Sequence, residues 1–550
     1  MAGFRSISSV TARPHELQSR AQSSTAPVAT RPATIDPAAL DFLLRNGRSG
    51  RVSPLFAAMV GGGLPTVRRA LPDAMHLAAT ETPAADGPPS TPTGLHHFSS
   101  EINDPDWRRV PGYRDVTSAE WNDGRWQQRH TVTKLGDLKT VLGDHLTDEL
   151  MADIAADQTR FATMAIRLPP NMIAMLDLNN LRNDPVRRYM LAMASDRHGE
   201  WPTHPMATRD SLHEAEMWTA PGLTHRYPTK VLFETTDRCP QYCSHCTRLN
   251  VVGPDVPQVI KQKFGKPTLE RYADVFKYLA AHPTVTDVVV SGGDVASLPP
   301  DTLEAIVIRL IELGTIRDIR LASKGLMGMP QHFLRDDVLA VMGKIAALAR
   351  AANVRLALHT HVNHPNQVTA TLRQAVSRIR DLGFDAVRNQ GVLLRGVNSD
   401  SEVLIALCNK LFEAGIVPYY FYNCDMIPNA EHWRLAIWEA QLLERGFRGR
   451  LSGYKIPQIV CDAPYAGKML VHHHDTYDRD RGVTEWQKMW LRPDEVNDPA
   501  RRAIASRYFD PVYTLSATGQ AWWRERVAAL RAAGVDNPSY DDFFGTSSNA

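Results

Sequence analysis

Three cysteines lie close together in the segment DRCPQYCSHCTR, which spans residues 237–248. The chain has 550 residues and six cysteines, so this grouping is no disulfide framework and is more typical of a metal site in a reducing compartment. At the spacing C-x3-C-x2-C, three thiolates can bind three corners of an iron–sulfur cube and leave the fourth iron open to a small molecule. We therefore predict that Cys239, Cys243 and Cys246 hold a [4Fe–4S] cluster.

A zinc knuckle is the first alternative for this segment. Structural zinc sites usually take four ligands in two C-x2-C pairs. Here His245 would have to be the fourth ligand although it directly precedes Cys246, which is poor geometry for one tetrahedron. A chance grouping of buried thiols is the second alternative, and the cysteines alone leave both open.

The elements around the cysteines indicate an α/β fold. Between residue 229 and about residue 430, apolar stretches typical of strands alternate with amphipathic stretches typical of helices. The predicted strands are KVLFETT (230–236), VTDVVVSGG (285–293), IRDIRLAS (316–323), VRLALHTHV (354–362), FDAVRNQGVLL (384–394) and VPYYFYNCD (417–425). In the helix predicted over 366–383, Asn366 is expected to be the N-cap and Gly383 the stop. Six β/α units in series predict a parallel sheet, either open or curled into a partial (β/α)6 barrel.

Ligands of such sheets bind beyond the carboxyl ends of the strands. The cysteines follow the first predicted strand, and the segment SGGD, residues 291–294, closes the second. Two glycines allow the backbone to approach a ligand closely, and the acid can accept a hydrogen bond from an ammonium group. We therefore expect the binding site at this edge of the sheet.

Composition divides the chain into four parts. Residues 1–105 are rich in Pro, Ser, Thr, Ala and Gly and are expected to be a mostly disordered arm. Residues 106–225 read as a helical N-terminal region, and 226–475 as the core that carries the site. Residues 476–550 are expected to be a helical C-terminal extension, which includes a helix near 517–533.

The overall composition argues against several classes of partner. Hydrophobic residues make up 43% and charged residues 22% of the chain, and the net charge is +2, so no nucleic-acid partner is indicated. No run of about 18 apolar residues occurs, and no secretory signal follows the first residues, so we predict a cytoplasmic protein without a membrane partner. The Arg- and Ser-rich start weakly resembles a transit peptide, which is the less favoured alternative.

Further stretches of the sequence resemble one known family, in that family's order, between about residues 110 and 475. The stretches are EWNDGRWQQRH (120–130), NDPVRR (183–188), PGLTHRYP (221–228), TDRCPQYCSHCTR (236–248), SGGD (291–294), THVNHPN (360–366), NQGVLLRGVN (389–398), PYYFYNCD (418–425) and SGYKIPQIVCDAP (452–464), followed by Lys468. The chain thereby resembles the lysine 2,3-aminomutase family of the radical S-adenosylmethionine superfamily.

This resemblance implies an isomerase, an intramolecular aminotransferase that interconverts L-lysine and L-β-lysine by moving the amino group to the neighbouring carbon. It implies three cofactors, which are a [4Fe–4S] cluster, S-adenosylmethionine and pyridoxal 5'-phosphate. It also implies an external electron donor of the flavodoxin or ferredoxin type.

The resemblance assigns roles to individual residues. For S-adenosylmethionine it implies His245, Ser291, Gly292, Gly293, Asp294, His361 and Gln390, although His359 and His364 compete with His361. For pyridoxal phosphate it implies Lys468 as the catalytic lysine that forms the imine, and Arg226, Tyr227 and Lys230 at the phosphate. Lys230 stands where the family usually has an arginine, so the charge is kept and the bidentate fork is lost.

Four residues are implied for the substrate. Arg248 matches the arginine that binds the substrate α-carboxylate, and Asp425 and Asp462 match two acids that bind the distal ammonium of lysine. Tyr422 is the fourth. The loop after the third predicted strand departs from the family, because Ser323 is followed by Lys324, Gly325 and Leu326 where the family has Arg-Thr-Pro, and a shift in substrate scope is one interpretation.

Several functional alternatives stay open at this point. The two acids suit the guanidinium of arginine as well as an ammonium, and a lysine carried by a protein such as a translation factor is another target. A scaffold protein that has lost catalysis is the alternative outside enzymes, and the retained cysteines, Arg248 and Lys468 speak against it. The family's zinc cysteines are missing, since no cysteine follows Cys461, and this leaves assembly into a homo-oligomer undecided.

Overall fold

The computed structural model of the chain describes residues 101–266, 268–488, 490, 491, 495 and 505–545. These residues belong to one compact unit, Glu81–Ala550. The arm predicted over 1–105 therefore lies outside the described residues except for its last five positions.

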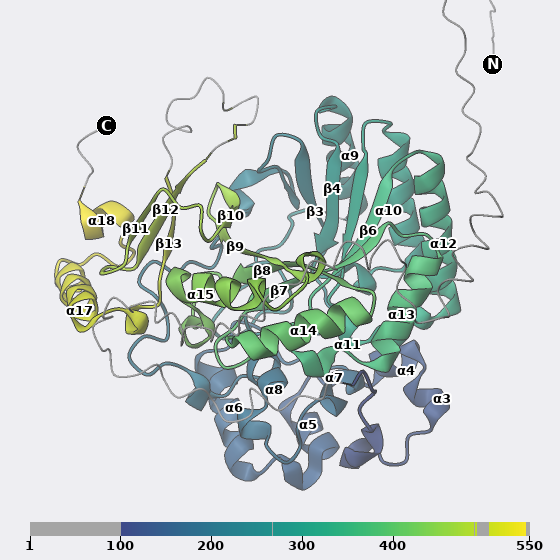
Figure 1. Cartoon of the computed structure of the whole chain (residues 1–550), viewed down its shortest axis with the longest axis horizontal. Helices are drawn as coiled ribbons and strands as arrows, with labels where there is room; N and C mark the ends of the chain where they lie inside the picture. The colour runs from purple at the N-terminus through teal and green to yellow at the C-terminus, as the bar shows by residue number, and fades with distance from the viewer. Residues whose placement is uncertain (1–100, 267, 489, 492–494, 496–504, 546–550) are drawn as a thin grey trace, which may run out of the picture. The chain divides into compact units, whose positions relative to one another are not determined.

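Residues 106–225 consist mainly of short helices, as predicted. They are α3 (Ser118–Trp121), α4 (Gly124–Arg129), α5 (Leu135–Leu142), α6 (Asp148–Arg160), α7 (Pro170–Ala174) and α8 (Pro185–Met190), and they gather beneath the sheet in Figure 1. The hydroxyl of Thr147 caps α6 by accepting a hydrogen bond from the amide of Leu150 at 3.3 Å. Two short strands, β1 (Trp218–Ala220) and β2 (Leu223–Thr224), end this region and join the main sheet.

The main sheet contains ten strands among the described residues, in the order β1 to β10 along the chain. Its longer strands are β3 (Lys230–Thr236), β4 (Asp287–Gly292), β5 (Asp318–Ala322), β6 (Arg355–Thr360), β7 (Ala386–Leu393), β8 (Val417–Asn423), β9 (Gln458–Ala463) and β10 (Gly467–Leu470). Strands β3 to β9 are parallel, and β10 returns antiparallel to β9. The six predicted strands are β3 to β8, so the α/β fold and its parallel sheet are confirmed. The partial barrel stays a prediction.

Helices connect successive parallel strands. They are α9 (Thr268–Ala281), α10 (Pro300–Glu312), α11 (Gly325–Gly328), α12 (Asp336–Ala351), α13 (Ala370–Asp381), α14 (Ser401–Glu413) and α15 (Ile437–Arg448). Figure 1 shows α10, α12 and α13 along one side of the sheet. No helix in the described ranges combines the length and the apolar character that crossing a membrane requires.

The N-cap predicted for α13 is wrong. The helix begins at Ala370, and Thr369 is the N-cap, since its hydroxyl accepts a hydrogen bond from the amide of Leu372 at 3.2 Å. Asn366 lies instead in a 3-10 turn, and the extended backbone of Val368 separates that turn from the helix. The predicted stop is confirmed, because Gly383 follows the helix with a φ of +97°.

The register of the parallel ladder decides which side chains face the interior of the site. Val290 pairs with Leu321 and Leu321 with Leu358, and all three are fully buried. Successive residues of a strand point to opposite faces, so the next pair, Ala322 and His359, faces the other way and lines the cavity described below. The apolar alternation of the strands therefore directs the polar residues between them into the site.

The prediction of a purely helical extension over 476–550 is wrong. Three strands, β11 (Thr476–Asp478), β12 (Val483–Gln487) and β13 (Ala505–Phe509), form a second sheet, and α17 (Ala517–Ala532) and α18 (Tyr540–Phe544) follow. The helix near 517–533 is thereby confirmed. The sheet escaped prediction because its strands have five residues or fewer and β12 pairs with β13 across a long separation in the sequence.

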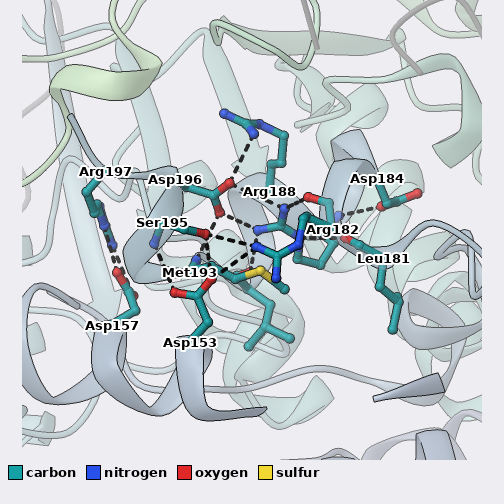
Figure 2. A network of polar contacts seen from close by, with 12 residues as sticks. Asp153, Asp157, Leu181, Arg182, Asp184, Arg188, Met193, Ser195, Asp196 and Arg197 are labelled. Carbon is teal, nitrogen blue, oxygen red and sulfur yellow. Dashed lines mark hydrogen bonds and ion pairs between the residues drawn. The ribbon is translucent and has the colours of Figure 1, made fainter. Parts of the chain in front are cut away.

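Buried ion pairs hold the N-terminal helices together (Figure 2). Arg197 pairs with Asp157 of α6 at 2.7 Å, and Asp196 pairs with Arg187 of α8. The exposed fractions of these four side chains are 5% or less, so removing one partner would leave a buried charge uncompensated. Arg197 also donates to the backbone oxygen of Asn429, which lies after β8, and this contact ties the network to the core.

We predict that Asp196→Asn lowers the free energy of unfolding by about 3 kcal/mol or more, because Arg187 and Arg188 both lose their charged partner. The control is Glu312→Gln, which breaks an exposed pair with Arg309 on α10 and should cost less than about 1 kcal/mol. Urea unfolding of both variants measures the difference. Equal, small losses would show that the network does not stabilise the fold.

Candidate active site

A cavity of about 320 Å³ runs along the parallel strands, from Lys230 at the start of β3 to the loops that follow their carboxyl ends. Every residue predicted for the site lines it except Asp294. The lining residues among them are Arg226, Tyr227, Lys230, Cys239, Cys243, His245, Cys246, Arg248, Ser291, Gly292, Gly293, His361, Gln390, Tyr422, Asp425, Asp462 and Lys468. The sequence-distant segments that were expected to meet at this edge of the sheet therefore do meet, while the role of each residue stays a prediction.

The three cysteines lie in the loop after β3 and are partly buried. A hydrogen bond from Cys246, together with the nearby charge of Lys324, lowers the pKa of Cys243 to about 6 against the effect of burial. The pKa of Cys246 is raised by the same hydrogen bond and by burial. At neutral pH this pair therefore holds a thiolate on Cys243, which is the form that binds a metal.

Lys324 was singled out as a departure from the family, and the structure gives it a definite place. Its ammonium is buried, has no hydrogen-bond partner among the described residues, and lies 4.9 Å from the centre of the Tyr189 ring. Its charge lowers the pKa of Cys243 and, after burial, that of His361. Lys324 thus acts on the cysteine end of the cavity, where it favours an anionic group.

The histidines beside the cysteines are neutral, since burial holds the pKa values of His245 and His361 well below the ordinary range. Their Nε2 atoms are 3.4 Å apart, and Asn363 donates to His361 at 3.0 Å. His359 also lines the cavity and accepts a hydrogen bond from the Gln390 amide at 2.7 Å. His364 is fully buried and does not line the cavity, so its competition with His361 is less favoured.

The SGGD turn after β4 packs against the loop after β3. A Cβ on Gly292 would collide with the backbone of Thr236, and one on Gly293 with that of Arg238, so both glycines allow the loops after β3 and β4 to touch. Asp294 is buried, and its carboxylate accepts hydrogen bonds at 2.8 Å from the amides of Ala296 and Gly325. It joins two loops and does not line the cavity.

At the opposite end, one carboxylate is shared by two cations. Asp462 lies 3.2 Å from the Lys468 ammonium and 2.9 Å from the Arg226 guanidinium. Burial alone would lower the pKa of Lys468, but the Asp462 carboxylate and the Tyr422 hydroxyl raise it well above its usual value. Lys468 is therefore held as an ammonium, and Asp462 already has two cationic partners.

The turn between β9 and β10 fixes the position of Lys468. The antiparallel register places Lys468 opposite Asp462 and Gly467 opposite Ala463. Gly467 has a φ of +86°, and a Cβ there would collide with the Tyr227 hydroxyl, which accepts a hydrogen bond from the Lys468 amide at 3.0 Å. The loop DAPYAGK therefore has its glycine at the position where geometry requires one.

Two acids that the sequence reading missed stand beside Arg248. Its Nε lies 3.1 Å from Glu214 and 3.2 Å from Glu234. Burial raises the pKa of Glu234 to about 8 although the Arg248 charge opposes this. Glu234 lies on the same face of β3 as Leu232, which lines the cavity, so an acid in an apolar strand was the signal for it. Glu214 sits in an irregular loop and carried no such signal.

Asp425 differs from the other charged residues of the cavity. Burial and the neighbouring Asp462 raise its pKa to about 7. Within the described part of the chain no basic side chain forms an ion pair with it, whereas Asp462 has two. Asp425 is therefore the carboxylate whose desolvation a cationic ligand would relieve.

Comparison with known proteins places the chain in a family. No protein-family model matches it. It is 33% identical over 360 residues to an L-lysine 2,3-aminomutase from Clostridium subterminale, covering 66% of this chain and 80% of that protein. Identity is 30% with a putative L-lysine 2,3-aminomutase from Aquifex aeolicus, over 69% and 94% of the two chains. It is 26% with a glutamate 2,3-aminomutase from Clostridioides difficile, over 64% and 76%.

A solved radical SAM methyltransferase from Sphaerobacter thermophilus matches 36% of this chain and 58% of its own at a TM-score of 0.26 and 16% identity. The relatives show that the protein is an isomerase of the class that moves an amino group within one molecule. The chain belongs to the lysine 2,3-aminomutase family of the radical S-adenosylmethionine superfamily, so the resemblance stated from its motifs is confirmed. That family implies S-adenosylmethionine and an iron–sulfur cluster as cofactors.

We predict that Asp425→Asn removes a pH-dependent destabilisation of the ligand-free protein. The carboxyl has a pKa of about 7 in the fold and about 4 in the unfolded chain, so wild-type stability falls as the pH rises between these values. The free energy of unfolding of the variant, relative to that of the wild type, should rise by at most about 4 kcal/mol from pH 4 to pH 8. The rise should be smaller if water in the cavity screens the charge. Urea unfolding across this range measures it.

The control is Asp536→Asn at an exposed position between α17 and α18, which should change the free energy of unfolding by less than about 0.5 kcal/mol across this range. If the free energy of unfolding of Asp425→Asn followed that of the wild type at every pH, this carboxyl would ionise as freely in the fold as in the unfolded chain.

Proposed function

We propose that the protein interconverts L-lysine and L-β-lysine with a [4Fe–4S] cluster, S-adenosylmethionine and pyridoxal phosphate. The observation that carries this proposal is the charge pattern of one cavity. Three cysteines line one end of it. Lys468 and two basic residues suited to a phosphate, Arg226 and Lys230, line the other end. Asp425, which forms no ion pair among the described residues, lines the same cavity.

The residues present fit these groups. The thiolate on Cys243 and the unpartnered ammonium of Lys324 suit a cluster with anionic ligands. At the other end, Nη1 of Arg226 is buried without a hydrogen-bond partner among the described residues, and the Lys230 ammonium lies 4.0 Å from the centre of the Tyr227 ring. These two cations suit a phosphate. When bound, the three groups supply hydrogen abstraction by a radical and a conjugated carbonyl for the amine.

Before Lys468 can bind pyridoxal phosphate covalently, its ammonium group must lose a proton. The Oδ2 atom of Asp462, 3.2 Å from the ammonium, is the acceptor in place. In the structure Asp462 is a weak base, because its pKa is held below the ordinary value by Arg226 and Lys468 against the effect of burial. A phosphate that competes for Arg226 would leave Asp462 a stronger base, so phosphate binding would itself prepare Lys468 to react.

The charges in the cavity favour a basic amino acid over glutamate. In the ligand-free protein Asp462 is paired with two cations and Asp425 with none among the described residues. Once Arg226 holds a phosphate and Lys468 has lost its proton, both carboxylates would be free for the distal cation of the substrate, which suits lysine and arginine alike; the names of the relatives favour lysine. A glutamate substrate would place a second carboxylate next to Asp425, which like-charge repulsion opposes. Arg248 remains the group for the α-carboxylate, with Glu214 and Glu234 holding its Nε.

Turnover tests the proposal directly. Protein purified without oxygen and supplied with iron, sulfide, pyridoxal phosphate, S-adenosylmethionine and dithionite should convert L-lysine into β-lysine, identified by mass and retention time. Cys243→Ala should abolish both the product and the iron–sulfur absorbance, because one corner of the cluster loses its ligand. Zinc in place of iron would refute the proposal, and product from arginine alone would change the substrate and leave the chemistry.

We predict that Lys230→Met weakens pyridoxal phosphate binding about tenfold or more, because a charge-assisted contact to the phosphate is lost. Lys230→Arg should restore or strengthen binding, since it supplies the bidentate fork. The dissociation constant is measured by absorbance titration of the protein without its cluster. Lys277→Met, on the exposed face of α9, is the control and should bind as the wild type. An unchanged constant for Lys230→Met would place the phosphate elsewhere.

A further inference from the structure

A second cavity, of about 430 Å³, lies on the other side of the cysteine loop. Cys239 and Tyr242 line both cavities, so the first cysteine of the motif forms part of the wall between them. The second cavity contains none of the other residues predicted for the site. It therefore reaches Cys239, a predicted cluster ligand, from outside the cavity proposed for substrate and cofactors.

Basic side chains dominate this outer pocket. Arg167, Arg238 and Lys263 line it against one acid, Asp237. Arg238 and Lys263 are exposed, and none of the three cations forms an ion pair within the described part of the chain. Arg167 donates through its Nε to the backbone oxygen of Cys239 at 2.8 Å, which couples the basic pocket directly to the cluster loop.

We propose that this outer basic pocket, defined by Arg167, Arg238 and Lys263, is the docking site for an acidic one-electron carrier protein. The proposal rests on the proposed function, because it requires a cluster at Cys239. In the transfer the reduced carrier loses one electron and the cluster gains one, and no covalent bond forms or breaks. Unpaired cations around a ligand of the redox centre would steer an acidic carrier to the point of closest approach.

The experiment compares two reductants of the same cluster. Reduced flavodoxin serves as the acidic protein carrier, and dithionite serves as a small reductant that needs no docking surface. The double variant Arg238→Glu and Lys263→Glu reverses the exposed charges. With flavodoxin, the rate of cluster reduction, followed by its absorbance, should fall at least about tenfold and lose most of its salt dependence. Dithionite is a small anion, so its rate of cluster reduction should fall less than that of flavodoxin, and the lysine turnover at saturating dithionite should stay within about twofold of the wild type.

Binding supplies a readout that needs no loaded enzyme. Calorimetric titration of the cluster-free protein with oxidised flavodoxin should give a dissociation constant at least about tenfold weaker for the double variant. The control changes charge equally, by Lys277→Glu and Arg531→Glu, at exposed positions outside the pocket, and should bind as the wild type. The single variant Lys263→Glu, in an exposed loop, should show part of the loss if the double variant fails to fold.

The outcomes separate this inference from the proposed function. Wild-type protein that is inactive even with dithionite refutes the proposed function and leaves the binding titration as the test of docking. Equal flavodoxin binding and reduction in the wild type and the charge-reversed variant overturn the docking proposal. The same holds if inorganic phosphate at millimolar concentration fills the pocket without slowing reduction by flavodoxin, because the pocket would then be a simple anion site.

Discussion

The Asp462 carboxylate shared between Arg226 and Lys468 is the interaction on which the rest of the site depends. Buried charges are tolerated when they are paired, and here one carboxylate on β9 satisfies two cations from different segments. The antiparallel register of β9 and β10 brings Lys468 opposite this acid, and Gly467 allows the chain to turn tightly enough. Because Asp462 is paired with two cations in the ligand-free protein, its neighbour Asp425 is left as the acid of the cavity without an ion pair among the described residues.

The two ends of the cavity differ in the charge that the protein leaves without a partner. Lys324 places an unpartnered ammonium near the cysteines, and Asp425 places a carboxyl without an ion pair among the described residues near Asp462. An anionic cluster would satisfy the first, and the distal ammonium of a substrate would satisfy the second. Arg248 contributes little net charge between them, since Glu214 and Glu234 accompany it. An anionic ligand at one end would compensate the charge of Lys324, and a cationic ligand at the other would compensate that of Asp425.

The strands were predictable because each carries an apolar alternation, and the rule that ligands bind at carboxyl ends then located the cavity. What the sequence could not show depends on contacts between distant segments. Asp294 stays a predicted cofactor ligand, and its carboxylate accepts a hydrogen bond from the amide of Gly325 in another loop, a contact that residue type alone does not reveal. Glu214 acquires its role only when the chain before β1 folds against Arg248. In the sheet β11–β13, β11 and β12 form a hairpin, but β13 joins β12 only across a long separation in the sequence, which no local pattern displays.

These distant contacts also explain how parts outside the core support the site. The Tyr508 hydroxyl on β13 donates to the backbone oxygen of Cys424 at 3.1 Å, directly before Asp425. From the N-terminal side, Arg197 lies 5.0 Å from the centre of the Trp433 ring and donates to Asn429. Both contacts act on the segment after β8 that carries Asp425. A buried acid with a raised pKa would move toward water if its backbone were free, so contacts from both sides are what keep it in the cavity for a cationic ligand.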